Sequence, residues 1–109
     1  MRQSAAESTR RNEVTTVHAV IRAYSGNSEL ADALVEHADE VRQLISGISG
    51  FKAYYVLKLD EGTSTVSVFE NQQGAEESNR AAAAWLKDNL PDMNVQPPYV
   101  TAGEVLLSF

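Results

Sequence analysis

Hydrophobic and polar residues alternate along two early segments in the pattern typical of β-strands. Within residues 13–25, one face carries only apolar residues, namely Val17, Ala19, Ile21 and Ala23. The other face is mixed and carries Thr16, His18, Val20, Arg22 and Tyr24. Residues 51–60 alternate again, with an apolar face made of Phe51, Ala53, Tyr55, Leu57 and Leu59. The pattern therefore predicts a strand over each segment.

Two more strands follow from turn residues and composition. The short turn 60–63 contains Gly62, which is free to take a positive φ, and the residues after it are strand-like over 64–71. This segment is expected to pair with residues 51–60 as an antiparallel hairpin. A last strand is predicted over residues 99–109, with Gly103 as a bulge or a point of close approach.

Helical periodicity marks two other segments. Ser28 is placed to cap a helix that ends near Gly47, and its apolar stripe recurs at steps of three and four residues. The stripe consists of Leu30, Leu34, His37, Val41, Leu44 and Ile48. The second helix covers residues 73–90, is rich in alanine and stops before Pro91, because proline cannot continue a helix.

The resulting order, strand, helix, strand, strand, helix, strand, predicts an α+β fold of the ferredoxin-like βαββαβ type. In that fold an antiparallel four-stranded sheet carries two helices on one face. The positions assigned to the bare face include Thr16, Val20, Tyr24, Tyr54 and Val56, which would form a large patch for a monomer surface. We therefore expect a homodimer through the open sheet face, which makes a dimeric α/β barrel.

Length and composition narrow the function classes. The 109 residues are enough for one domain, with residues 1–12 as a polar, flexible N-terminal arm and residues 13–109 as the folded part. The absence of cysteine excludes disulfides, a thiolate zinc site and a cysteine nucleophile. A net charge of −6 argues against nucleic acid as a partner. No apolar run is long enough for a membrane span and no signal peptide is found, so a cytoplasmic protein is expected.

The second helix carries the candidate chemistry. One of its faces combines small side chains with amides and has Trp85 at its edge; the face consists of Ala75, Ser78, Asn79, Ala82, Leu86 and Asn89. Small residues leave volume and amides supply hydrogen bonds, which together indicate a lined pocket. His37 and Tyr55 are expected to join it from the first helix and the neighbouring strand.

Each of these residues also has a structural explanation. Asn79 and Asn89 could form a hydrogen-bonded pair or face solvent, His37 could be a satisfied core histidine, and Trp85 could anchor the core. The run of alanines could serve close packing of the helix on the sheet. Two histidines without a third ligand do not suggest a metal site, and no cofactor-binding motif is found, so neither a metal nor a cofactor is expected.

The sequence resembles the antibiotic-biosynthesis-monooxygenase-like (ABM) domains of the dimeric α/β-barrel superfamily. The resemblance covers residues 14–109 and is carried by the stretch SGISGFKAYYVLKLDEGTSTVSVFENQQGAEESNRAAAAWLKDNL and the closing GEVLLSF. Its most recognisable parts are Gly50-Phe51, Val68-Phe69-Glu70, Ser78-Asn79-Arg80 and Trp85.

This resemblance implies a cofactor-independent monooxygenase that acts on a small aromatic or polyketide-like substrate. In such enzymes the substrate is deprotonated and its carbanion passes an electron to O₂. Asn79, Trp85 and Tyr55 are the candidate positions for holding the substrate, with Asn89 on the same helix face and His37 as a candidate base. Haem-degrading members have a histidine shortly after the helix tryptophan, and residues 86–90 contain none, so haem degradation is not expected.

The alternative is a non-catalytic small-ligand-binding or stress-associated dimer that keeps the barrel without the chemistry. Cavity volume separates the two interpretations. A pocket of roughly 300 Å³ or more, lined by Asn79 and His37, favours ligand chemistry. An interface filled by Trp85 and leucines favours the alternative.

Overall fold

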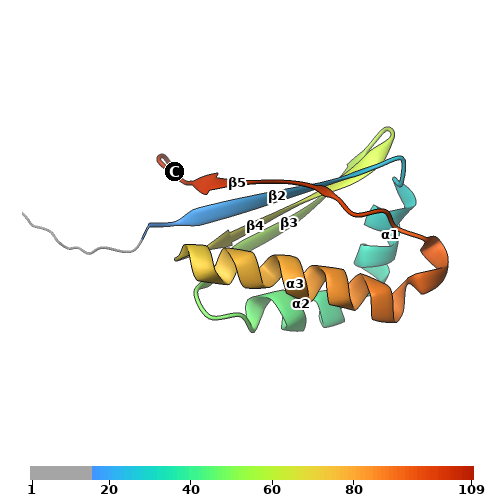
Figure 1. Ribbon diagram of the computed structural model, residues 1–109, viewed down its shortest axis with the longest axis horizontal. Helices are drawn as coiled ribbons and strands as arrows, with labels where there is room; N and C mark the ends of the chain where they lie inside the picture. The colour runs from blue at the N-terminus through green and yellow to red at the C-terminus, as the bar shows by residue number, and fades with distance from the viewer. Residues whose placement is uncertain (1–15) are drawn as a thin grey trace, which may run out of the picture.

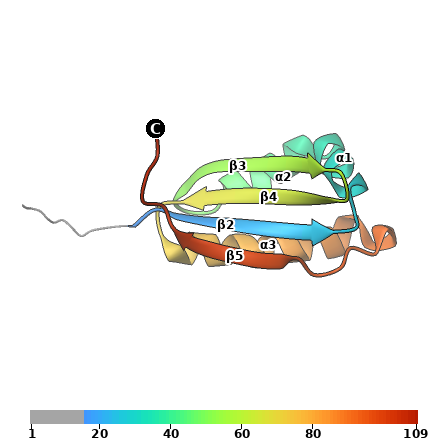
Figure 2. The same ribbon diagram turned by 90° about the horizontal axis from the view of Figure 1, so that it is seen from above.

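A computed structural model describes residues 16–109 and places four strands in one sheet (Figure 1). The expected arm, residues 1–12, and the beginning of the first predicted strand lie outside the described residues. The strand order is β3-β4-β2-β5, and each neighbouring pair is antiparallel. Seen from above, the sheet lies in front of the helices, so its near face is uncovered by any helix (Figure 2).

The elements follow the predicted order and confirm the ferredoxin-like arrangement. The bounds are β2 His18–Ser25, α1 Glu29–Glu36, α2 Ala38–Ser46, β3 Phe51–Leu59, β4 Gly62–Phe69, α3 Gln72–Asn89, a 3₁₀ turn η1 Pro91–Met93 and β5 Tyr99–Glu104. Within residues 16–109, none of the helices has the length and apolar character needed to cross a lipid bilayer.

The first predicted helix is in fact two helices. The chain leaves helical geometry at His37, where φ is −105° and ψ is 27°, and this residue ends α1 and begins α2. Both helices keep their apolar side on the sheet, since Leu30 and Leu34 of α1 and Val41 and Ile45 of α2 are buried. No glycine or proline lies at the break, so the sequence pattern gives no sign of it.

The prediction of which sheet face is open was wrong. Val20 and Tyr24 are buried beneath the helices, and Tyr54 and Val56 are partly buried against the same core. The open face instead carries the purely apolar sets apart from Phe51, which packs on the core beyond a register shift between Phe51 and Ala53. On this open face, Ile21 is 43% exposed and Tyr55 is 58% exposed. Cross-strand register confirms that these two residues share one face, because both lie opposite Val66.

Helix α3 packs closely on the sheet at its N-terminal end. The Asn71 side chain caps the helix by accepting a hydrogen bond from the Gly74 backbone N–H at 2.7 Å. A Cβ at Gly74 would come within 2.9 Å of the Phe69 ring and 2.8 Å of the Ser49 carbonyl oxygen. The absence of a side chain at Gly74 therefore permits close packing at this end of α3, whereas Ala83 and Ala84 of the alanine run are exposed.

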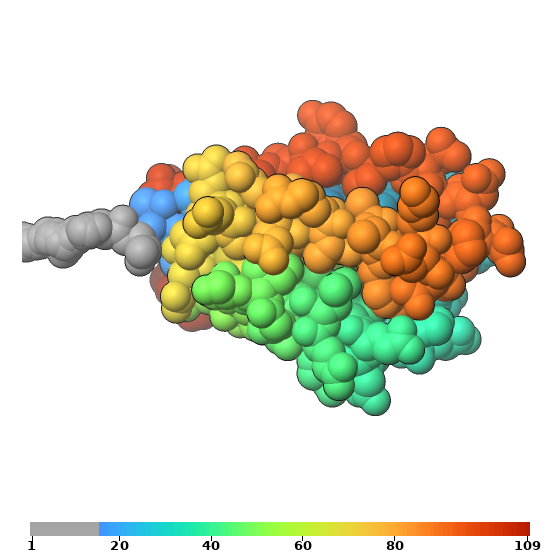
Figure 3. All heavy atoms as spheres, turned by 60° about the horizontal axis from the view of Figure 1, so that its bottom comes forward, coloured from blue at the N-terminus to red at the C-terminus, as the bar shows by residue number. Residues whose placement is uncertain are grey.

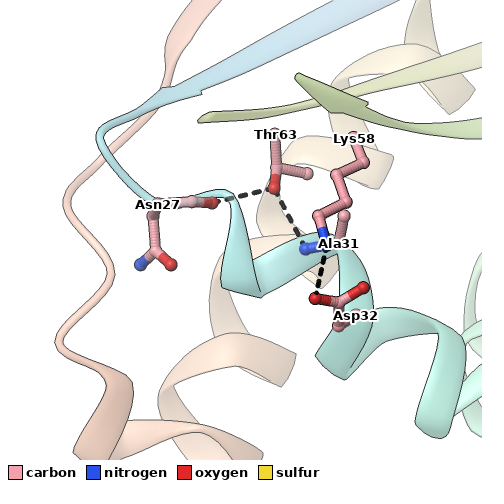
Figure 4. Close-up of polar contacts among 5 residues, drawn as sticks. All are labelled: Asn27, Ala31, Asp32, Lys58 and Thr63. Carbon is pink, nitrogen blue, oxygen red and sulfur yellow. Dashed lines mark hydrogen bonds and ion pairs between the residues drawn. The ribbon is translucent and has the colours of Figure 1, made fainter. Parts of the chain in front are cut away.

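Helix α1 is fixed to the start of β4 by one buried hydroxyl (Figure 4). The Thr63 Oγ1 donates to the Asn27 carbonyl oxygen at 2.8 Å and accepts from the Ala31 backbone N–H at 3.0 Å. It thus gives a second acceptor to an N–H group in the first turn of α1, which also donates to the Ser28 carbonyl oxygen at 3.2 Å. Nearby, the exposed Lys58 and Asp32 form an ion pair of 2.8 Å.

We expect Thr63→Val to lower the free energy of unfolding by about 1–3 kcal/mol, because it leaves the Ala31 N–H and the Asn27 carbonyl without this partner. The measurement is urea unfolding followed by circular dichroism. Lys58→Gln is the control in the same region and is expected to cost less than about 1 kcal/mol, since its ion pair is exposed. Equal costs for the two substitutions would contradict the role given to Thr63.

Candidate functional site

A cleft opens between helix α3 and strand β5. Helix α3 packs on β2 and β4, whereas every residue of β5 is exposed, so the sheet is uncovered along this edge. In the space-filling view, blue atoms of β2 are visible between the orange atoms of α3 and the red atoms of β5 (Figure 3). The cleft has a volume of about 450 Å³. This is within the range of small-molecule sites.

Three prolines direct the path of the chain that forms the rim of the cleft. Pro91 ends α3 and begins the turn η1, and Asn94 takes a left-handed conformation with φ 57°. The chain then returns to β5 through Pro97 and Pro98, which line the cleft. The remaining apolar lining comes from Ala83, Leu86, Leu90, Val95 and Val100. The cleft is thus apolar over most of its wall.

Arg22 of β2 lines the inner wall of this cleft and is only 2% exposed. Its Nε donates to Thr65 Oγ1 at 3.2 Å and its Nη1 to Ser78 Oγ at 3.2 Å. The Nη1 also donates to Asn79 Oδ1 at 2.5 Å, and the Nη2 donates to Ser67 Oγ. All four acceptors are uncharged, so the hydrogen bonds solvate the cation without neutralising it.

The hydroxyls around Arg22 explain an unusual feature of β4. This central strand is buried on its helical face, yet the residues there are Thr63, Thr65 and Ser67 rather than large aliphatic residues. A buried cation is costly unless hydrogen bonds replace its lost water. Thr65 and Ser67 provide two of those bonds from β4, and Ser78 provides a third from α3.

Two buried tyrosines lie near the guanidinium. Burial raises the pKa of Tyr24 and Tyr54 above the ordinary value of 10.0, and the positive charge of Arg22 offsets part of the rise. Burial likewise lowers the pKa of Arg22 from its ordinary value of 12.5, against the influence of the two phenols. At neutral pH the phenols are uncharged, and they leave the charge of Arg22 uncompensated.

Asn79 is the sequence-predicted residue that lies in the cleft. Because a guanidinium only donates hydrogen bonds, the amide atom facing Arg22 is the oxygen. The amide nitrogen Nδ2 of Asn79 is consequently directed away from the guanidinium of Arg22. Asn79 also lines a smaller space of about 180 Å³ further along the gap between α3 and β5, together with His18, Gln72 and Glu76.

The other sequence-predicted residues lie elsewhere. His37 lies at the junction of α1 and α2, with its ring edge-on to Trp85 at a centroid distance of 5.3 Å. Trp85 packs between the helices and the sheet beside a space of only about 20 Å³. Asn89 is exposed and donates to the Trp85 carbonyl oxygen at 3.0 Å. Tyr55 lies on the open face of the sheet, opposite the cleft.

The residues that the sequence predicts to line one pocket thus lie in different parts of the structure. A cavity of sufficient size exists and Asn79 lines it, but His37 does not, and the interface at Trp85 is filled. Arg22 is the residue that sequence reasoning missed. A signal was available in the sequence of β4, which carries hydroxyl residues at every second position. One of them, Thr65, lies opposite the charged Arg22 of β2, and this pattern indicates a buried charge solvated by hydroxyls.

Two other features of the molecule bear on ligand binding. A groove of about 500 Å³ lies between α1, α2 and β3, but its one cationic residue, Arg42, is paired with Asp39 at 3.0 Å. In the part of the chain from residue 16 onward, no three His, Asp or Glu residues are placed to hold a metal ion together. Polar groups therefore converge at the Arg22–Asn79 cleft.

The raised pKa values of Tyr24 and Tyr54 predict a loss of stability at alkaline pH. As the pH rises past about 10, the unfolded chain releases these protons first, so the folded state binds more protons and its stability falls. We expect Tyr54→Phe to flatten this fall in a series of urea unfolding curves. Val35→Ala is the control, because it changes an exposed side chain that has no ionisable group. An unchanged slope in Tyr54→Phe would contradict this origin.

The sequence matches no protein-family model and no curated protein. Solved structures do match. A protein of unknown function from Nitrosomonas europaea is 21% identical with a TM-score of 0.65, over 87% of this chain and 94% of that one. A protein from the same organism, named "putative antibiotic biosynthesis monooxygenase", is 12% identical with a TM-score of 0.63, over 87% and 95%.

A third structure bears on assembly. A protein described as a dimeric ferredoxin-like protein, from an uncultured marine organism, is 15% identical with a TM-score of 0.57, over 88% of this chain and 92% of that one. At these identities the likeness concerns the fold. The chain has the ferredoxin-like fold found in ABM-like proteins, as the resemblance in its sequence implied.

Proposed function

We propose that this protein takes up a small, largely apolar organic molecule in the Arg22–Asn79 cleft and oxidises it as a cofactor-independent monooxygenase. The observation that carries the proposal is a cleft of about 450 Å³ with an apolar wall and two convergent polar side chains. That combination is typical of a small-molecule site. Solved structures of the same fold that are 12% identical and named "putative antibiotic biosynthesis monooxygenase" support the class of reaction.

In this reaction an aromatic or polyketide-like substrate loses a proton from an activated CH₂ group. The carbanion transfers one electron to O₂, and the radical and superoxide combine as a peroxide. Loss of water from the peroxide leaves a C=O group, so one oxygen atom enters the product and the other leaves as water. All electrons come from the substrate, and the route requires no cofactor.

Asn79 has the role of orienting the substrate. Its carbonyl oxygen is held by Arg22 at 2.5 Å, which leaves the Nδ2 group to donate to a substrate oxygen. A group fixed in this way costs little to order when the substrate binds. Leu86 and Val100 lie across the cleft wall and provide apolar contact for the body of the molecule.

A second candidate function is ligand binding without catalysis. It is favoured by one observation, namely that no histidine or carboxylate lines the cleft among the described residues. A protein base for carbon deprotonation would normally be one of these groups. Oxygen consumption distinguishes the two functions, since a binding protein would retain a quinol or anthrone without consuming O₂.

The activity is tested by oxygen uptake with a panel of anthrones and quinols. We expect saturable uptake with the native chain and a loss of about tenfold to a hundredfold in kcat/KM for Asn79→Ala, which removes a positioned hydrogen bond. Gln73→Ala is the matched control, an exposed amide on the same helix. Absence of uptake with every compound, or equal uptake by both variants, would reject the monooxygenase role of this cleft.

We also propose that the protein is a homodimer assembled through the open sheet face. This face carries exposed apolar residues on three strands, namely Ile21 on β2, Tyr55 on β3 and Tyr99 on β5. A contiguous apolar face of this kind is typical of an interface rather than of a free surface. The description of one structural neighbour as dimeric supports the same assembly.

The assembly predicts that Ile21→Glu converts the protein to a monomer, because the carboxylate would be buried unpaired at the interface. Light scattering coupled to size exclusion should give twice the chain mass of 11.9 kDa for the native protein and the single chain mass for the variant. Val35→Glu, at an exposed apolar residue on α1, is the control and should remain dimeric. A native protein that elutes as a monomer at micromolar concentration would rule this interface out.

A further inference from the structure

The residues that follow β5 form an apolar segment that its own chain leaves uncovered. Residues 105–109, called here the C-terminal segment, are Val105, Leu106, Leu107, Ser108 and Phe109, and none has a charged side chain. Leu106 and Leu107 are 82% and 79% exposed, and Phe109 is fully exposed. Apolar residues that are exposed singly are common on protein surfaces, whereas a group of large ones marks a site of interaction.

The C-terminal segment lies on the side of the sheet that the helices leave open. The backbone N–H of Val105 donates to the Val17 carbonyl oxygen at 2.8 Å, which extends the pairing of β5 with β2 just beyond Glu104. After this bond the chain turns away from β5 and passes the ends of the neighbouring strands, on the side opposite to the helices (Figures 1 and 2). No backbone hydrogen bond joins residues 106–109 to another described residue. The segment is therefore available for a contact outside its own sheet.

The open sheet face beside this segment carries no charge. Its middle row crosses all four strands and consists of Tyr55, Val66, Ile21 and Thr101. The residues two positions away along each strand lie on the same face, and all of them are uncharged. Two chains with a net charge of −6 repel each other, so an interface between them is favoured where the facing surfaces add no further charge. The open face and the segment together provide such a surface.

A second copy of the chain matches this surface by symmetry. In a two-fold symmetric dimer every contact occurs twice, so a segment of one chain that reaches the other is repeated in the opposite direction. The segment extends from the same side of the sheet as the open face. When two copies meet through their open faces, each segment is therefore directed toward the other copy.

We propose that, in the homodimer, the C-terminal segment of each chain packs on the open sheet face of the other chain through Leu106, Leu107 and Phe109. This inference rests on the proposed homodimer and assigns to it an interaction surface beyond the strands. It also concerns the cleft, because β5 packs chiefly on β2 within its own chain and its Val100 lines the cleft. Since the segment continues directly from β5, its contact with the second copy holds this wall of the cleft in place.

The first test measures the dissociation constant of the dimer by analytical ultracentrifugation. Replacing both leucines, Leu106→Ser with Leu107→Ser, should raise this Kd by at least about a hundredfold, since burial of each leucine side chain contributes about a factor of ten or more. Val35→Ser is the control, because Val35 is an exposed apolar residue of α1, on the helical side of the sheet, and it should leave the Kd unchanged. All three side chains are exposed within one chain, so the variants are expected to fold.

The second test locates the segment by crosslinking. The chain has no cysteine, so Leu107→Cys provides a single thiol for a benzophenone maleimide. Chains of two isotopic compositions are mixed, and mass spectrometry then separates crosslinks between chains from crosslinks within one chain. We expect crosslinks between chains, from position 107 to residues of the open sheet face such as Ile21 and Tyr55. The same label at Val35→Cys should give no crosslink between chains.

An unchanged Kd in the double leucine variant would overturn the inference, as would crosslinks confined to one chain or directed to the helices of the other. These results are separate from the fate of the homodimer itself. Dissociation by Ile21→Glu together with a native Kd in the double leucine variant would keep the sheet-face dimer and reject the role of the segment. A native chain that is monomeric at micromolar concentration would reject the dimer and the segment contact together.

Discussion

The burial of one positive charge in the middle of the helical face of the sheet governs much of this structure. Arg22 has lost nearly all its contact with water, so the surrounding elements must provide hydrogen-bond acceptors. Strand β4 provides hydroxyls where a hydrophobic strand would normally have aliphatic residues, and α3 provides Ser78 and Asn79. The choice of residues on two elements, β4 and α3, thus follows from a single side chain on β2.

The same constraint explains which part of the fold the sequence could predict. Element order and the apolar stripes of the helices depend on local periodicity, and the structure agrees with them at Leu30, Leu34 and Val41. The face of the sheet depends on long-range partners. The mixed face of β2 lies inward because Arg22 finds neutral acceptors there, and the purely apolar face of Ile21 lies outward. Alternation alone favours the opposite assignment.

The candidate site was predicted only in part, because some of its residues also depend on partners far away in the sequence. Asn79 could be recognised because an amide on an alanine-rich helix face is unusual. Arg22 could not be recognised from its own strand, since its role depends on hydroxyls that follow more than forty positions later in the sequence. Tyr55 was assigned to the cleft together with the rest of its apolar strand face, and it lies on the open face once that assignment is reversed.

Asn79 has a consequence for the extent of the space between α3 and β5. Its side chain lines both the large cleft and the smaller space beside His18, so it lies between two compartments of one gap under β5. A shorter residue at this position would join the compartments, and a bulkier one would close them off from each other. Position 79 therefore determines how much of the gap between α3 and β5 is one continuous space, without any change in the surrounding elements.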